Sequence, residues 1–187
     1  MSSKTAGISD EAVRAKTGKN WQEWFALLDS VNASEMSHKE IARYLYEKQD
    51  VPGWWAQMVT VGYEQARGLR QKNQSCDGDF QVGCSKTISV PLSALYEAWQ
   101  DERQRRAWLA DPDFTVRKAT QDKSMRITWV DGRSSVSVYF YAKGENKSQV
   151  VVDHTKLADQ EEVEVKRAYW AHNLGQLKQL LESQHAQ

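Results

Sequence analysis

The sequence predicts an α+β protein, in which a small helical domain precedes an antiparallel sheet and a long C-terminal helix. Through about the first 67 residues, apolar side chains recur at the three- and four-residue spacing of amphipathic helices. From residue 80 onward they alternate with polar ones, which is the spacing of half-buried strands. After Asp159 the helical spacing returns and continues almost to the end of the chain.

The composition limits the class of protein. The chain has 187 residues, of which 40% are hydrophobic and 27% charged, so we expect a globular protein of one compact or two small domains. Its 25 basic and 25 acidic residues cancel, so the electrostatic drive behind most nucleic-acid binding is missing. No apolar run is long enough for a signal peptide or membrane span, and two cysteines cannot build a disulfide framework. We expect a cytoplasmic protein without membrane contact.

The N-terminal helices are predicted from their start signals. A short helix is expected over about 9–16. Two capping boxes follow, in which an N-cap side chain is followed three residues later by a glutamate: Asn20 with Glu23, and Ser37 with Glu40. They predict helices over about 20–31 and 38–48.

A fourth helix is expected over 52–67, with Pro52 in its first turn and Gly68 as its stop. Trp54 and Trp55 begin two adjoining apolar rows along it. Such a wide face predicts burial by two neighbouring helices, which makes a small core. The alternative is an aromatic surface that binds a partner.

The polar segment after Gly68 predicts a linker at 71–78, between a helical domain at 1–70 and a second domain at 79–187. Five strands are expected in the second domain, with two short helices after the first of them. The predicted strands span 80–90, 114–120, 125–130, 135–142 and 148–157.

Several segments of the second domain carry a resemblance to a known superfamily. These are SKTISVPLSALYEAW at 85–99, SMRITW at 124–129, VYFYAKGENKSQVVVDHTKL at 138–157 and the helix that contains Trp170. They resemble the START-like helix-grip (SRPBCC, birch-pollen-allergen-like) superfamily, in the branch named after the Hsp-ninety ATPase activator. The first domain is similar to a small helical domain of unknown function that is fused ahead of such folds in bacterial proteins.

The resemblance implies a curved sheet wrapped on the last helix, with an apolar cavity between them. Members of the superfamily carry lipids, hormones or polyketide-like ligands, or act as co-chaperones, and a minority are enzymes. This chain has five predicted strands where members generally have six or seven. A shorter sheet encloses less volume, and tryptophans are available to fill it, so we expect a reduced helix-grip fold with a small cavity or none.

The leading hypothesis for function is non-enzymatic binding of a small apolar ligand in this cavity, or of a protein partner in a co-chaperone-like role. Eleven side chains are predicted to line the space between sheet and helix, with His154 as the single polar group. They are Trp99, Trp108, Met125, Ile127, Trp129, Val138, Phe140, Val152, His154, Trp170 and Leu174.

Two alternatives remain open. A hydrolase or cyclase would use His154 with an ordered water, and would need it in an open cavity beside a carboxylate. A DNA-binding regulator would use the helices of 37–67, although no Lys or Arg lies between Pro52 and Gln65. No catalytic residue, metal site or cofactor is assigned, and His38 is expected to be solvated.

Overall fold

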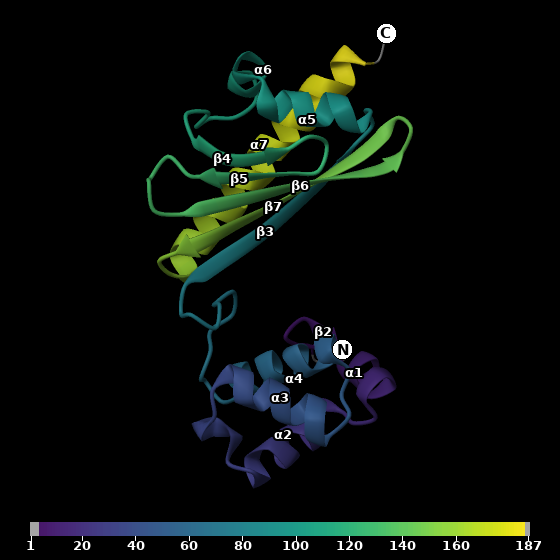
Figure 1. Ribbon diagram of the computed structural model, residues 1–187, viewed down its shortest axis with the longest axis vertical. Coiled ribbons are helices and arrows are strands. Elements are labelled where there is room, and N and C mark those ends of the chain that lie inside the picture. The colour runs from purple at the N-terminus through teal and green to yellow at the C-terminus, as the bar shows by residue number, and fades with distance from the viewer. Residues whose placement is uncertain (1–3, 186–187) are drawn as a thin grey trace. The chain divides into compact units, whose positions relative to one another are not determined.

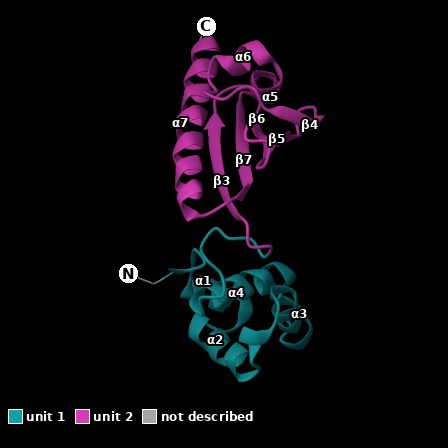
Figure 2. Ribbon diagram, turned by 90° about the vertical axis from the view of Figure 1, so that its left-hand side faces the viewer, with its two compact units in different colours: residues 1–76 teal, residues 77–187 magenta. Residues whose placement is uncertain are grey.

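The computed structural model describes residues 4–185, so the outermost ends of the two predicted domains, 1–3 and 186–187, lie outside the described residues. The chain divides into two compact units, residues 1–76 (unit 1) and 77–187 (unit 2), coloured separately in Figure 2. The division falls within the segment 71–78 that the sequence assigns to a linker. Each unit is described by itself.

Unit 1 is a group of short helices that follow a small hairpin along the chain (Figure 1). Its elements are β1 (Lys4–Thr5), β2 (Ile8–Ser9), α1 (Asp10–Thr17), α2 (Trp21–Ser30), the 3-10 helix η1 (Ala33–Glu35), α3 (His38–Lys48) and α4 (Gly53–Ala66).

Both predicted capping boxes are confirmed. The backbone N–H of Glu23 donates to Asn20 Oδ1 at 2.8 Å, and the backbone N–H of Asn20 donates to Glu23 Oε2 at 2.7 Å. Ser37 and Glu40 form the same pair of contacts at the start of α3. Each box satisfies backbone donors that a helix N-terminus otherwise leaves unpaired, so the sequence places both helix starts correctly.

The core of unit 1 gathers apolar side chains from α1, α2, α3 and α4. The largest fully buried members are Trp24, Leu28, Ile41, Leu45 and Tyr63. Helix α4 faces this core with Ala56, Val59, Thr60 and Tyr63.

The predicted burial of Trp54 is wrong, because its side chain is 61% exposed. Trp55 is only half-buried and meets the Trp54 ring edge-on, with 4.9 Å between ring centroids. The reason is that α4 is apolar almost all round, so the sequence pattern does not decide which face turns inward. The small residues Ala56 and Gly62 lie on the inward side, where they allow close approach of the other helices.

Unit 2 is a five-stranded antiparallel sheet with helices against one face, as the sequence predicts. The strand order is β3-β7-β6-β5-β4. In Figure 1, α7 runs diagonally behind the sheet, and in Figure 2 it lies along β3. The elements are β3 (Phe80–Ile88), α5 (Leu92–Gln100), α6 (Glu102–Arg106), β4 (Thr115–Thr120), β5 (Ser124–Thr128), β6 (Ser135–Gly144), β7 (Lys147–Leu157) and α7 (Gln160–Gln184).

The strand register sets which side chains face the helices. On β7, Val150, Val152 and His154 alternate with Val151 and Asp153. The first three are fully buried, and the other two lie partly exposed on the opposite face. The sheet therefore has an inner face toward α5 and α7 and an outer face away from them.

A close contact at Gly62 provides a test of unit 1. A Cβ at this position would lie 2.8 Å from Cη2 of Trp21, a rigid, buried ring whose Nε1 donates to the Ile8 carbonyl at 3.1 Å. We expect Gly62→Ala to lower the free energy of unfolding of unit 1 by about 1–3 kcal/mol, because a packed core resists added volume. The measurement is urea unfolding together with hydrogen exchange of the α4 amides.

Gly53 is the matched control, since it lies on the same helix and a Cβ there would meet nothing within 4 Å. Gly53→Ala should leave stability equal or slightly improved. Equal destabilisation by both substitutions would contradict the packing argument.

Candidate functional site

Four tryptophans form the centre of unit 2. The Trp170 ring on α7 packs against Trp99 of α5 and Trp129, which follows β5, with ring centroids 6.0 and 5.2 Å away. Trp108 packs against Trp99 at 4.8 Å, and its Nε1 donates to the Ala98 carbonyl at 3.0 Å. The interior between sheet and helix is thus occupied by the rings of the chain itself.

The structure brings the eleven predicted lining residues together in this interior. Each is at most 4% exposed, ten of them belong to one apolar core, and the eleventh, His154, packs against Trp129 and Trp170. Four hollows among the described residues are lined by other side chains, three on unit 1 and one on the outer face of the sheet. That the eleven residues bind a ligand stays a prediction.

His154 lies at the centre of a short chain of hydrogen bonds. Trp170 Nε1 donates to His154 Nδ1 at 3.1 Å, and His154 Nε2 lies 2.8 Å from Ser134 Oγ. The Ser134 hydroxyl donates to Asp131 Oδ2 at 2.6 Å. Because the indole can only donate and a carboxylate can only accept, Nδ1 must accept and Nε2 must donate, which makes His154 a neutral imidazole.

Electrostatics agree with this assignment. Burial, with a smaller contribution from the Lys166 charge, lowers the pKa of His154 to about 4. Burial alone would raise the pKa of Asp131, but hydrogen bonds from Ser134 and Arg133 outweigh it, and the pKa is lowered. His154 is therefore neutral and Asp131 ionised at neutral pH.

This geometry does not favour the hydrolase or cyclase alternative. A general base must reach substrate or water, whereas His154 is fully buried and both ring nitrogens already have partners. Among residues 4–185, no group of His, Cys, Asp and Glu is arranged to hold a metal ion.

Two polar atoms in the same interior are unpaired. The indole Nε1 atoms of Trp99 and Trp129 are buried and have no hydrogen-bond partner. A buried donor without an acceptor costs roughly 1–3 kcal/mol, so these two groups would gain from an acceptor placed between sheet and helix.

Comparison with solved structures concerns the fold. A protein of unknown function from Staphylococcus aureus matches 58% of this chain and 97% of its own, with a TM-score of 0.50 and 10% identity. An AHSA1-like protein from Rhizobium etli matches 55% of this chain and 82% of its own (TM-score 0.47, 17% identity). The Aha1 dimer from Colwellia psychrerythraea matches 55% of this chain and 96% of its own (TM-score 0.48, 16% identity).

Unit 2 has the helix-grip fold. The strand order, the two helices after β3 and the long helix after β7 give this topology, and the resemblance inferred from the sequence is confirmed at the level of the fold. No protein-family model matches the chain, and no functionally curated protein matches it significantly. Unit 2 is called the helix-grip unit from here on.

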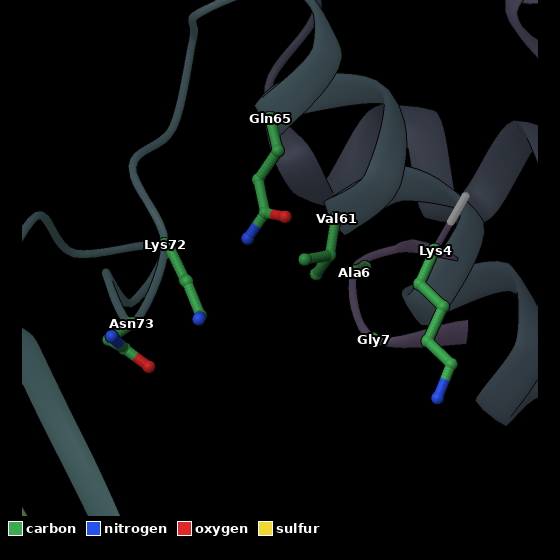
Figure 3. A pocket seen from close by; sticks show the side chains of 7 residues that line it. All are labelled: Lys4, Ala6, Gly7, Val61, Gln65, Lys72 and Asn73. Atoms are coloured by element: carbon green, nitrogen blue, oxygen red, sulfur yellow. The ribbon is translucent and has the colours of Figure 1, made fainter. Parts of the chain in front are cut away.

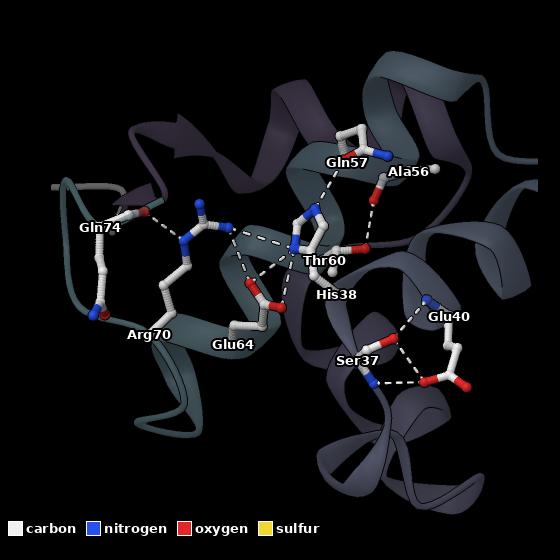
Figure 4. Close-up of polar contacts among 9 residues, drawn as sticks. All are labelled: Ser37, His38, Glu40, Ala56, Gln57, Thr60, Glu64, Arg70 and Gln74. Carbon is white, nitrogen blue, oxygen red and sulfur yellow. Dashed lines mark hydrogen bonds and ion pairs between the residues drawn. The ribbon is translucent and has the colours of Figure 1, made fainter. Parts of the chain in front are cut away.

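In unit 1 the structure reveals a polar cluster that sequence reasoning missed (Figure 4). His38 Nδ1 lies 3.0 Å from both carboxylate oxygens of Glu64, and its Nε2 lies 2.8 Å from Gln57 Oε1. Arg70 donates to Glu64 Oε2 at 3.1 Å and to the Gln74 carbonyl at 2.6 Å. The expectation that His38 is solvated is wrong, because Glu64 and Arg70, which lie 26 and 32 positions later in the sequence, contact its ring.

The cluster joins α3, α4 and the segment after α4. The hydrogen bond to Glu64 raises the pKa of His38. Burial would raise the pKa of Glu64, but His38 and Arg70 outweigh it, and the pKa is lowered. Each charge has an opposite neighbour, so the cluster holds the three segments together and lacks an unpaired reactive group.

The hollows lie on surfaces. One of about 500 Å³ is enclosed by the β1–β2 turn, α4 and the segment after it, with Lys4, Gln65 and Lys72 at its rim (Figure 3). Another, of about 510 Å³, lies between α3 and α4. A third, of about 250 Å³, lies on the outer face of the sheet.

Within residues 4–185, no helix is long and apolar enough to cross a bilayer.

The buried imidazole predicts a specific pH dependence. In the unfolded chain His154 takes up a proton near pH 6.5, and in the folded chain only near pH 4. Its contribution to stability is complete above pH 6.5 and is lost as pH falls toward 4. We expect the free energy of unfolding of the helix-grip unit to decrease by about 3 kcal/mol over this range through His154.

The measurement is urea unfolding at several pH values, compared with His154→Asn. This variant keeps an acceptor for Trp170 but does not titrate, so its stability should depend less steeply on pH between 6.5 and 4. If the free energy of unfolding depended on pH equally in both proteins, the His154 imidazole would take up its proton as readily in the folded as in the unfolded chain, which would contradict the prediction.

Proposed function

We propose that this protein is a non-enzymatic binding protein that recognises a protein partner through unit 1. One observation carries the proposal: an apolar groove between α3 and α4 is lined by an exposed tyrosine, and an exposed tryptophan follows one of its lining residues in the sequence. Tyr46, which lines the groove, is 60% exposed, and Trp54, next to the lining residue Gly53, is 61% exposed. Aromatic side chains are the usual anchors of protein interfaces, and leaving them in water is unfavourable.

The shape of this α3–α4 groove suits an inserted side chain. Its lining includes the small residues Ala42, Gly53 and Ala56, whose short side chains leave space between the two helices. With a volume of about 510 Å³, the groove has room for an aromatic or leucine side chain and part of the backbone that carries it.

The charged side chains of the groove indicate which kind of partner segment it fits. Lys39 and Arg43 are the charged lining residues, and no carboxylate lines the groove. Arg43 pairs with Glu47 at 2.8 Å, but both side chains are largely exposed, so this pair is weak and replaceable. The partner we propose is a segment with one aromatic or leucine anchor flanked by acidic residues.

The filled interior of the helix-grip unit supports surface binding over a carrier role. A carrier needs space that its ligand occupies, and here the four tryptophans pack against one another in that place. The helix-grip unit then acts as the folded body to which unit 1 is attached.

A second candidate function is binding of a small, mainly apolar ligand by the eleven interior residues. It is favoured by the unpaired Nε1 atoms of Trp99 and Trp129, because a ligand carrying hydrogen-bond acceptors would satisfy them. Such a ligand would enter only if α7 moves away from the sheet.

Peptide display on the full-length protein tests the leading proposal. Enriched peptides should combine an aromatic residue or leucine with acidic flanks. Trp54→Ala should weaken the best peptide by about tenfold or more, as expected for an interface anchor. Binding is measured by fluorescence anisotropy of the labelled peptide.

Tyr141→Ala is the matched control, because it removes an aromatic ring that is 46% exposed on the helix-grip unit. Its affinity for the peptide should equal that of the wild type. Enrichment of basic peptides, or equal weakening by both variants, would contradict the proposed groove.

The ligand candidate is tested by thermal shift with a panel of fatty acids, sterols and aromatic polyketides. The leading proposal predicts no shift in the melting temperature of the helix-grip unit. A stabilising compound whose effect is lost in Trp129→Phe, which keeps an aromatic ring but removes the N–H, would establish the second candidate instead.

A further inference from the structure

The outer face of the sheet carries a small polar groove that is independent of the function proposed above. It lies across β3, β7 and β6, where Gly83 pairs with Asp153 and Asp153 pairs with Ser137. The groove has a volume of about 250 Å³. Its polar lining side chains are Gln81, Ser137, Tyr139, Asp153 and Thr155.

Gly83 is an unfavourable residue inside a strand. It contributes no side chain to pack and weakens the strand, and such glycines often mark a place where another group approaches closely. A Cβ at this position would lie 3.2 Å from Asp153 Oδ1. The glycine therefore keeps one side of the carboxylate uncovered.

Asp153 is unfavourable for a different reason. It is partly buried, and this burial raises the pKa of its carboxyl group against the opposing charge of Arg126. The described residues provide it with neither a hydrogen bond nor an ion pair, although a buried carboxylate normally has both.

The arginines of β4 and β5 have hydrogen-bond partners other than Asp153. Arg126 donates to Tyr139 Oη at 2.8 Å and lies over that ring, 4.9 Å from its centroid. Arg117 contacts the Ile127 carbonyl and Ser135 Oγ, both at 3.5 Å. The groove thus has an anionic centre with hydroxyl and amide groups around it, and the Arg126 guanidinium is bonded to the lining residue Tyr139.

We propose that this outer-face groove binds an organic cation, a guanidinium or an alkylammonium group, with Asp153 as its counter-ion. The N–H groups of such a cation would satisfy the Asp153 oxygens over the space left by Gly83, and further N–H groups would reach Ser137 and Thr155. A charge-assisted pair of this kind is stronger than a neutral hydrogen bond. The cation has two sources, a free small molecule or an arginine or lysine side chain of a protein.

The experiment is a titration of the ¹⁵N-labelled full-length protein followed by NMR. The two probes are N-acetylarginine amide and a blocked pentapeptide with arginine at its centre. We expect saturable shifts of the Gly83, Ser137 and Asp153 amide signals at millimolar concentrations, as a single pair on a small site allows. Tighter binding of the pentapeptide assigns the source to a protein, and tighter binding of the small probe assigns it to a metabolite.

Two variants address different features of the groove. Asp153→Asn keeps the shape and removes the charge, and we expect binding to weaken at least tenfold. Gly83→Val keeps the charge and covers it, and we expect binding to be lost. Glu145→Gln is the matched control, since it removes one carboxylate in the exposed turn between β6 and β7 and should bind like the wild type.

Stability gives an independent measurement. Because the folded pKa of Asp153 is raised, its ionised form disfavours folding above the unfolded pKa. Asp153→Asn should therefore melt at the same temperature as the wild type or higher. Unchanged binding by Asp153→Asn, absence of saturable shifts with both probes, or a clear fall in its melting temperature would overturn the proposal.

Discussion

Unit 2 depends on the contact between Trp170 of α7 and the inner face of the sheet. This ring meets Trp99 and Trp129, and its N–H group donates to the buried imidazole of His154. Burying each aromatic ring stabilises the fold by roughly 2–3 kcal/mol. The hydrogen bond requires a neutral His154, and the lowered pKa of that group meets this requirement. Apolar packing and protonation state are therefore coupled at one point of the core.

The filled core is the reason for proposing binding at the surface. The side chains of the chain itself occupy the place in which a cavity would lie, and the binding surfaces that we propose use exposed positions that cost stability. Trp54 leaves an indole in water, Gly83 is a glycine inside a strand, and Asp153 is a partly buried carboxylate without a partner. Features that stability alone would remove tend to be retained for function, and here they occur on surfaces of both units.

The parts of the structure that the sequence predicts are those with local signals. The capping boxes at Asn20 and Ser37 need only four residues, and strand alternation places Trp129 and His154 on the inner face without knowledge of their partners. The burial predicted for Trp54 is wrong because apolar residues are spread around most of α4, so the pattern does not single out the inward face. His38 was misplaced because its environment comes from Glu64 and Arg70, distant in the sequence. The groove at Gly83 and Asp153 depends on strand register, which alternation does not give.

The two units hold their histidines in opposite ways, and this separates their responses to acid. The pKa of His38 is raised by Glu64, so its contribution is complete below the unfolded value of 6.5 and is lost as pH rises through the folded value. The contribution of His154 is complete above 6.5 and is lost as pH falls. Mild acid therefore strengthens the link among α3, α4 and the segment after α4, while it weakens the packing of α7 on the sheet. A histidine in an ion pair and a histidine in an apolar core thus give one chain two regions of opposite pH sensitivity.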